Sequence, residues 1–246
     1  MPSPPEYNAL QAGHTGATAS HHGLAFQPWV LMAVERRCHH AVIIDISPPI
    51  RPGIQNWPGD TPYSRRKLST FEDGGGLDLG TIETSVHVGA HTDAPRHYHP
   101  EGADVASVPV DAYYGLCQVV DVKARRGKHF DFVDIQQSID APRVLCKTGT
   151  FPDPDLWNTD FAAPSPSCIH ELGDRSVVLV GFDTPSTDLF ASKGLESHQA
   201  LRRHGMMNLE GLVLAHVPAG HYTLIALPLR LEGMDGSPVR AVLVAD

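Results

Sequence analysis

The sequence predicts a single α/β domain with a central mixed, barrel-like β-sheet and surrounding helices. Two observations carry this prediction. From residue 41 onward, short runs rich in β-branched residues recur, and several are almost continuously apolar, as strands buried on both faces are. Helical patterns between these runs are few and short, which argues against a regular doubly wound sheet and favours a mixed one.

Eight segments are predicted to be strands, because each is rich in β-branched residues and is bounded by turn-forming residues. In order they are AVIIDI (41–46), LGTIETSVHV (79–88), LCQVVDV (116–122), RVLCKT (143–148), SVVLVGF (176–182), LVLAHV (212–217), YTLIALPL (222–229) and PVRAVLVA (238–245). Between them we expect a helix over 131–139 with Asp131 as its cap, a helical turn near 166–172, and a helix over 196–204 that ends before Gly205.

Residues 1–40 differ from the rest of the chain, because they are rich in Ser, Gly, Ala and His and lack sustained periodicity. We therefore expect a disordered or loosely docked leader, followed by one folded domain over residues 41–246. Met32 lies shortly before the first predicted strand, so translation that starts there is a further hypothesis. An intact mass that includes all 246 residues would contradict it.

Composition limits the partners and the compartment. The net charge of −9 argues against binding to nucleic acid or to an anionic membrane surface. No apolar run approaches the length of a membrane span, and the N-terminal region has no signal-peptide pattern. The four cysteines form no C-x-x-C pair, which is typical of reduced thiols in a cytoplasmic protein. A small-molecule substrate is the partner that remains.

The stretch HVGAHTDAPRH (87–97) is the strongest candidate for chemistry, because it holds three histidines and an aspartate. Gly89 and Pro95 argue against a helix here. In an extended strand His87 and Asp93 would lie roughly 20 Å apart, too far to share an ion. The chain must bend if these residues act together, and Gly89 permits the bend. Imidazole and carboxylate ligands suit zinc, or manganese where oxygen ligands dominate.

The motif H-x-G-x-H-x-D-x-P-x-H resembles the signature of the cyclase-like metal-dependent hydrolases, a family that includes bacterial kynurenine formamidases (arylformamidases). The resemblance extends over about residues 41–246. It includes DISPPI (45–50), WPGDTP (57–62), GFDTPSTDLFASKGLESH (181–198), HGMMNLEGLVL (204–214) and the C-terminal stretch with GMDGSPVRAVL. It implies a fold of the swivelling β/β/α type, a homodimer, and a hydrolase domain over residues 41–246.

The resemblance also implies two zinc ions per subunit and a role for each matching residue. His87 and His91 would bind one zinc, His198 would bind the second, and Asp93 and Glu210 would bridge them. His97 would be the catalytic acid/base, and Trp57 would line the substrate pocket. The implied reaction is hydrolysis of N-formyl-L-kynurenine to L-kynurenine and formate, a step of tryptophan degradation.

Several alternatives stay open. The same ligands would serve an enzyme that acts on another formamide or on a cyclic amide such as isatin, and a metal-binding protein without turnover is a second alternative. Trp57 could be a packing residue at a turn, and His97 could be a metal ligand. Glu210 without the resemblance would be taken as a surface residue. A serine hydrolase is excluded, because the chain has no G-x-S-x-G motif.

Overall fold

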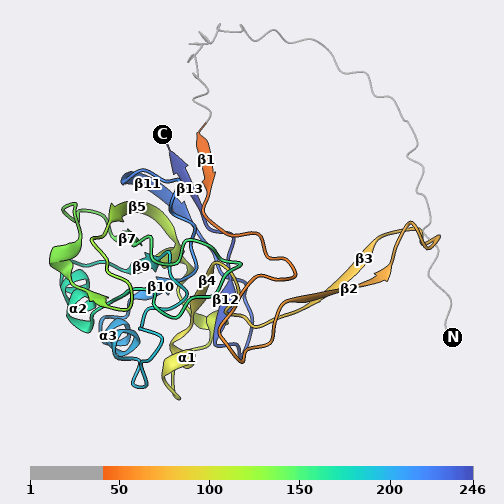
Figure 1. Ribbon diagram of the computed structural model, residues 1–246, viewed down its shortest axis with the longest axis horizontal. Helices are drawn as coiled ribbons and strands as arrows, with labels where there is room; N and C mark the ends of the chain where they lie inside the picture. Colours follow the sequence, from red (N-terminus) through yellow and green to blue (C-terminus); the bar gives the residue numbers. More distant parts are fainter. Residues whose placement is uncertain (1–40, 246) are drawn as a thin grey trace, which may run out of the picture. The chain divides into compact units, whose positions relative to one another are not determined.

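The structure, a computed structural model, describes residues 41–245 of the chain. A seven-stranded mixed sheet is its largest element (Figure 1). The strands from β1 to β5 in this sheet pair antiparallel, and those from β5 to β10 pair parallel. In sheet order they are β1 (Val42–Asp45), β13 (Val242–Ala245), β11 (Gly220–Ile225), β5 (Tyr114–Asp121), β7 (Arg143–Lys147), β9 (Leu179–Phe182) and β10 (Met207–Leu209).

The remaining elements are short. Three two-stranded pairs accompany the sheet: β2 (Ser64–Ser69) with β3 (Leu79–Glu83), β4 (His91–Asp93) with β12 (Gly236–Pro238), and β6 (His129–Phe130) with β8 (Ala163–Pro164). The helices are α1 (Pro95–Tyr98), α2 (Pro166–Asp174) and α3 (Glu196–His204), with single 3₁₀ turns η1 (Val105–Ser107), η2 (Val110–Tyr113) and η3 (Phe132–Asp134). Among residues 41–245, no helix combines the length and the apolar character that crossing a membrane requires.

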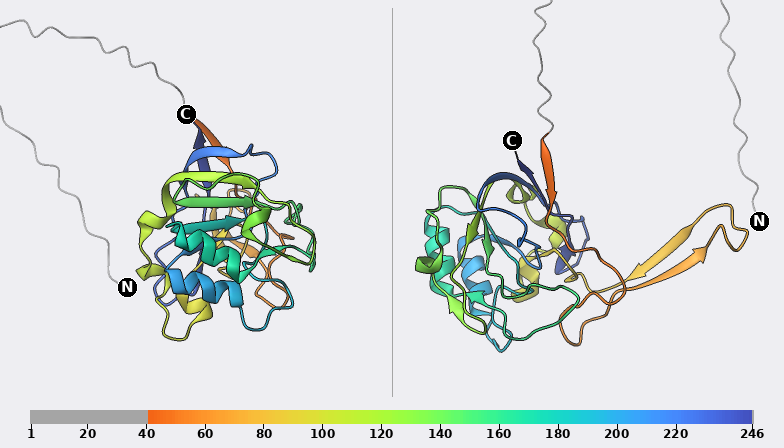
Figure 2. Two further views of the ribbon diagram at one scale, coloured as in Figure 1. Left: turned by 90° about the vertical axis from the view of Figure 1, so that its left-hand side faces the viewer. Right: turned by 45° about the horizontal axis from the view of Figure 1, so that its top comes forward.

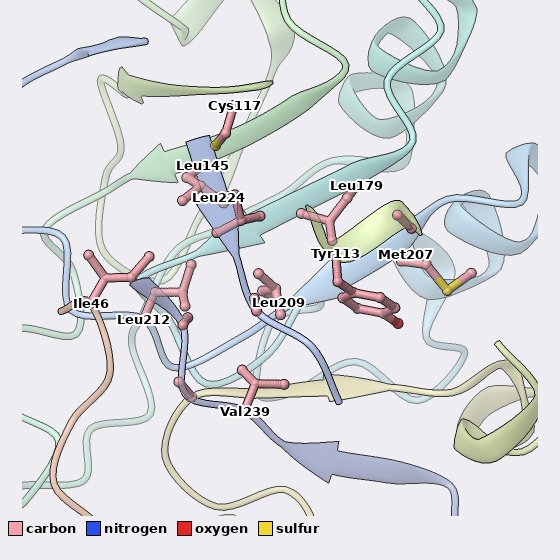
Figure 3. Packing of buried hydrophobic residues seen from close by; sticks show 14 of the residues in the cluster. Ile46, Tyr113, Cys117, Leu145, Leu179, Met207, Leu209, Leu212, Leu224 and Val239 are labelled. Atoms are coloured by element: carbon pink, nitrogen blue, oxygen red, sulfur yellow. The ribbon is translucent and has the colours of Figure 1, made fainter. Parts of the chain in front are cut away.

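Helices α2 and α3 cover one face of the parallel half of the sheet (Figure 2). Their apolar side chains, among them Ile169, Leu172 and Leu201, pack with Val144 and Val180 of β7 and β9. Figure 3 shows the core on the opposite face, where side chains from strands far apart in the sequence meet. Strands β7 and β9 are therefore buried on both faces, which explains their nearly continuous apolar sequences.

Most predicted elements are present, with differences that have physical reasons. The helix over 196–204 is confirmed, and it ends at Gly205 in the left-handed conformation. The strand predicted over 212–217 is wrong, because this segment has no regular structure. Its apolar composition has another reason: Leu212 and Leu214 pack into the core from a loop. Asp131 does cap a helical segment, but that segment is only the 3₁₀ turn η3.

The barrel-like character of the predicted sheet is not confirmed. Within residues 41–245, β1 and β10 are the two edges of the sheet and do not pair with each other. The mixed sheet and the small number of helices agree with the prediction. The leader expected over residues 1–40 lies outside the described residues.

A close approach of two chain segments joins β4 to the end of β10. His91 N donates a hydrogen bond to Glu210 O (3.1 Å), and Glu210 N donates one to His91 O (2.9 Å). The next residue, Gly211, has φ +65°, and a Cβ atom there would lie 2.3 Å from Gly89 O. Only glycine can occupy this position without displacing the segment that carries His91.

We expect Gly211→Ala to lower the free energy of unfolding by at least about 3 kcal/mol, because a clash with the Gly89 carbonyl adds to left-handed backbone strain. Gly205→Ala is the matched control, since Gly205 has φ +62° and nothing lies within 4 Å of the added Cβ. The control should lose only roughly 1–2 kcal/mol. Chemical denaturation measures both variants, and equal losses would contradict the role of the close approach.

Candidate metal centre

Strand β4 and the bend before it bring three of the candidate ligands together. His91 and Asp93 are alternate residues of β4, so their side chains lie on the same face. Gly89 adopts φ +61° and turns the chain, which brings His87 back toward that face. His87 Nδ1 then lies 2.8 Å from Asp93 Oδ1. The bend that the sequence required at Gly89 is present.

The first turn of α3 and the residue after β10 supply the other two candidates. His198 Nε2 lies 3.2 Å from Asp93 Oδ2 and 3.4 Å from Glu210 Oε1. His91 Nε2 lies 3.3 Å from Glu210 Oε2. The two oxygens of each carboxylate therefore face different histidines. His91, Asp93, His198 and Glu210 are at most 3% exposed, so these contacts lie largely out of reach of bulk water.

The surroundings of Asp93 Oδ1 indicate that these residues suit a metal ion. This atom is buried and accepts no hydrogen bond, although His87 Nδ1 is only 2.8 Å away. A buried carboxylate oxygen without a donor is costly, whereas two ligands of one cation approach each other in this way without a hydrogen bond. Ligand atoms of His87, His91 and Asp93 lie within 4.8 Å of one another, as do those of Asp93, His198 and Glu210. The imidazole and carboxylate donors fit divalent metal ions such as zinc or manganese.

Each of the three histidines makes a hydrogen bond through the nitrogen that faces away from the cluster. Such bonds fix the ring orientation and leave the other nitrogen free for an ion. The pairs are His87 Nε2 with Asp235 Oδ2 (3.1 Å), His91 Nδ1 with Gly89 O (2.9 Å), and His198 Nδ1 with Asp188 Oδ2 (2.6 Å).

Two residues that sequence reasoning missed hold this arrangement in place. Asp188 accepts hydrogen bonds from the backbone N–H groups of Ser197 and His198, and so caps the N-terminus of α3. The same carboxylate contacts His198 Nδ1 and orients the ring. Asn208 Nδ2 donates to Asp93 Oδ2 (2.6 Å) and to Glu210 Oε1 (3.0 Å). The sequence offered only their positions as an indication of this role: Asp188 is the last residue of the DTPSTD motif, and Asn208 precedes Glu210 by two residues.

The histidines and carboxylates of the cluster change one another's pKa values. Burial alone lowers the pKa of His87, but the hydrogen bond with Asp235 and the nearby negative charge of Asp93 outweigh burial and raise the pKa to about 10. Burial likewise opposes the charge of Asp93, yet His198 and His87 hold its pKa well below the usual value. Protons on His87 and His198 thus balance the carboxylates, and a divalent cation can do so in their place.

A cavity of approximately 310 Å³ opens onto the cluster. Trp57 forms part of its wall and packs against Phe190 (5.0 Å between ring centroids) and Trp157 (5.5 Å). Trp57 is therefore both a packing residue and a lining residue. Among the lining residues in the described part of the chain there is no Lys or Arg.

The structure brings all seven residues singled out from the sequence to this cavity. His97 lies on α1 beside the cluster, and its ring centroid is 4.3 Å from that of His87. Its side chain is 32% exposed, unlike the buried side chains at the cluster. The lining includes His87, His91, Asp93, His97, His198, Glu210 and Trp57.

Solved structures share this fold. A potential metal-dependent hydrolase with cyclase activity is 27% identical, with a TM-score of 0.72 over 84% of this chain and 98% of that one. A predicted metal-dependent hydrolase from Bacillus stearothermophilus is also 27% identical, with a TM-score of 0.70 over 83% and 98%. Isatin hydrolase A from Labrenzia aggregata, bound to benzyl benzoate, is 23% identical, with a TM-score of 0.71 over 83% and 94%. At this identity, the similarity to isatin hydrolase A shows a shared fold.

The family model described as "Putative cyclase" matches residues 44–189, which is more than half of the chain. The matched region contains the stretch 87–97 and ends just after Asp188. On this match, with the similarity of fold, the chain belongs to the family described as "Putative cyclase".

Proposed function

We propose that this protein is a metal-dependent amide hydrolase that converts N-formyl-L-kynurenine into L-kynurenine and formate. One observation carries the proposal. Asp93 and Glu210 are buried at the floor of a cavity with an aromatic wall, and both carboxylate oxygens of each residue lie close to histidine nitrogens. The 27% identity to two solved structures named as metal-dependent hydrolases supports hydrolysis with a metal.

His87 and His91 would hold one zinc ion and His198 the second, with Asp93 and Glu210 shared between them. When bound, zinc acts as a Lewis acid and lowers the pKa of water toward neutrality. The two carboxylates reduce the repulsion between the cations, and Asn208 keeps those carboxylates side by side. Because these ligands are buried, the packing around them would limit their rearrangement during the reaction.

His97 would move the proton that the leaving group needs. An aniline nitrogen is a poor leaving group until it is protonated, and an imidazole titrates in the range that suits this transfer. Nδ1 of His97 contacts Asp235, so Nε2 is the nitrogen that gives its proton to the departing amine. Trp57 and Trp157, which both line the cavity, would pack against the aryl ring and exclude water around it.

A second candidate function is hydrolysis of a cyclic amide such as isatin. The specific observation in its favour is the absence of Lys and Arg among the described lining residues, because the carboxylate of N-formyl-L-kynurenine would find no cationic partner there. Isatin carries no charge, and isatin hydrolase A shares the fold. A metal-binding protein without turnover is disfavoured, since it would need neither the cavity nor His97 beside the cluster.

We also propose that the protein is a homodimer. In the described part of the chain, β2 and β3 pair only with each other, and they extend away from the seven-stranded sheet (Figures 1 and 2). Isolated two-stranded hairpins are marginally stable in water, and exposed apolar side chains gather at interfaces. The hairpin and its turn carry large apolar side chains that are all at least half exposed: Leu68, Phe71, Leu77, Leu79 and Ile82.

Zinc-loaded protein should hydrolyse N-formyl-L-kynurenine, with kynurenine release followed by absorbance, and treatment with a chelator should abolish the rate. Isatin is assayed in parallel under the same conditions. Turnover of isatin alone would support the second candidate. No turnover of either substrate by protein with confirmed zinc would contradict the proposed hydrolase activity on this substrate class.

Asp93→Ala and Glu210→Ala should each lower the zinc content from about two equivalents per chain to one or less, because each carboxylate faces ligands of both ions. Elemental analysis after dialysis measures the content. Asp60→Asn is the matched control, since Asp60 lines the same cavity but lies outside the cluster. Full zinc content in both alanine variants would refute shared ligation.

The double variant Leu79→Ser, Ile82→Ser should shift the protein from dimer toward monomer in light scattering coupled to size exclusion. Both side chains are exposed, so the folded state of the subunit should be retained. Val133→Ser is the control, because Val133 is 87% exposed and lies outside the hairpin. A monomeric wild type, or a variant that dimerises as wild type does, would contradict the assigned interface.

A further inference from the structure

Asp235 connects two histidines that the proposed function places in different roles. His87 Nε2 lies 3.1 Å from Asp235 Oδ2, and His97 Nδ1 lies 3.2 Å from the same oxygen. An aspartate carboxylate accepts hydrogen bonds only, and both contacts are made to the same oxygen of Asp235. Nε2 of His87 and Nδ1 of His97 must therefore each carry a hydrogen that is donated to Asp235.

This arrangement fixes a tautomer for each ring. When a metal takes the place of the second proton, His87 with its hydrogen on Nε2 would direct the lone pair of Nδ1 toward the side of Asp93, where the proposed ion would lie. His97 with Nδ1 donating to Asp235 has only Nε2 left for proton exchange. One oxygen thus determines both which nitrogen of His87 is a ligand and which nitrogen of His97 is the acid.

The backbone around Asp235 is built to keep this oxygen in place. Strand β12 pairs with β4, with Gly236 opposite Asp93, and Ala94 N donates a hydrogen bond of 2.8 Å to Asp235 O. A Cβ atom at Gly236 would lie 2.8 Å from the His87 ring, so glycine is needed for the ring to lie there. The motif around β4 and the C-terminal stretch are therefore joined at this point.

His97 depends on Asp235 more than the buried histidines depend on their partners. It lies on α1, a helix of a single turn, and its side chain is one-third exposed. In residues 41–245, Asp235 is the polar partner that the His97 side chain contacts. Without this contact, ring rotation about the side-chain bonds would move Nε2 away from the reacting bond.

We propose that Asp235 is a positioning residue that holds the His87 and His97 rings through one carboxylate oxygen. The metal ligand and the proton donor are then fixed relative to each other. The His97 part of this inference rests on the proposed function, whereas the His87 part rests on metal binding alone. A direct metal ligand role for His97 and Asp235 is the competing interpretation, because these two residues and His87 also place ligand atoms within 4.8 Å.

The experiment compares full-length Asp235→Ala and Asp235→Asn with Glu232→Gln, which removes an exposed charge from the same loop. Zinc affinity is measured by competition with a chromogenic chelator, and kcat and KM are measured with the substrate that wild type turns over. Asp235→Ala should weaken zinc binding about tenfold to a hundredfold and lower kcat more than it changes KM. Asp235→Asn should recover part of both losses, because its amide oxygen still accepts a hydrogen bond, and Glu232→Gln should match wild type.

A double-mutant cycle with His97→Asn separates positioning from a general structural effect. His97→Asn should keep wild-type zinc affinity and lower kcat by roughly 10²–10⁴-fold. With saturating zinc, adding Asp235→Ala to His97→Asn should change kcat by no more than about twofold, since the ring that Asp235 holds is gone. Losses of kcat that multiply, or unchanged zinc affinity in Asp235→Ala, would overturn the proposal.

Two further outcomes are informative. Loss of zinc affinity in His97→Asn would overturn the proposal in favour of a metal ligand at that position. If wild type turns over neither substrate, the proposed function fails, yet the zinc affinities of the Asp235 variants still test whether this carboxylate holds His87. If Asp235→Ala does not fold, as judged by circular dichroism, Asp235→Asn carries the same comparison.

Discussion

The proximity of two buried carboxylates is the constraint on which the rest of this molecule depends. Asp93 and Glu210 share a hydrogen-bond donor, Asn208, and lie near one imidazole, His198. Two like charges without water between them repel strongly, so positive charge must be supplied from the protein or from bound ions. His87 and His198, whose pKa values their carboxylate neighbours raise, supply it as protons, and divalent cations would satisfy the same requirement.

This requirement explains why the fold joins segments that are distant in sequence. The reciprocal backbone bonds between His91 and Glu210 place the two carboxylates on neighbouring segments, and β12 closes the other side of β4. Helix α3 contributes His198 from its first turn, where Asp188 supplies the cap that Leu195 cannot. The large sheet contributes no ligand from its central strands; it provides the core against which these shorter pieces are held.

The sequence was informative wherever a local pattern decides the structure. Runs buried on both faces predicted β7 and β9, and the glycine at 205 predicted the end of α3. The segment 212–217 shows the limit, because an apolar run that packs into the core as a loop has the same composition as a strand. Strands β4, β10 and β12 have three residues each, too few for a period to be seen.

The residues of the candidate site likewise fall into those that the sequence could predict and those that it could not. The histidines and carboxylates of the cluster could be named from a motif, together with the family resemblance. Asp188, Asn208 and Asp235 could not, since their importance lies in which nitrogen or oxygen they contact, and this depends on tertiary pairing. Sequence also could not reveal that the sheet is open, because edge pairing depends on how far the strands twist around each other.

The cavity combines two parts of the chain that tolerate change differently. Its floor consists of residues on β4, α3 and the end of β10, which are buried and mutually hydrogen-bonded, whereas much of its wall comes from the connecting segments around Trp57, Phe151 and Trp157. Connecting segments accept substitution and insertion more readily than packed elements do. Natural variation can therefore reshape the wall and redirect the enzyme to new substrates while the reactive floor is inherited intact, so that one ancestral centre diversifies by exchange of its loops.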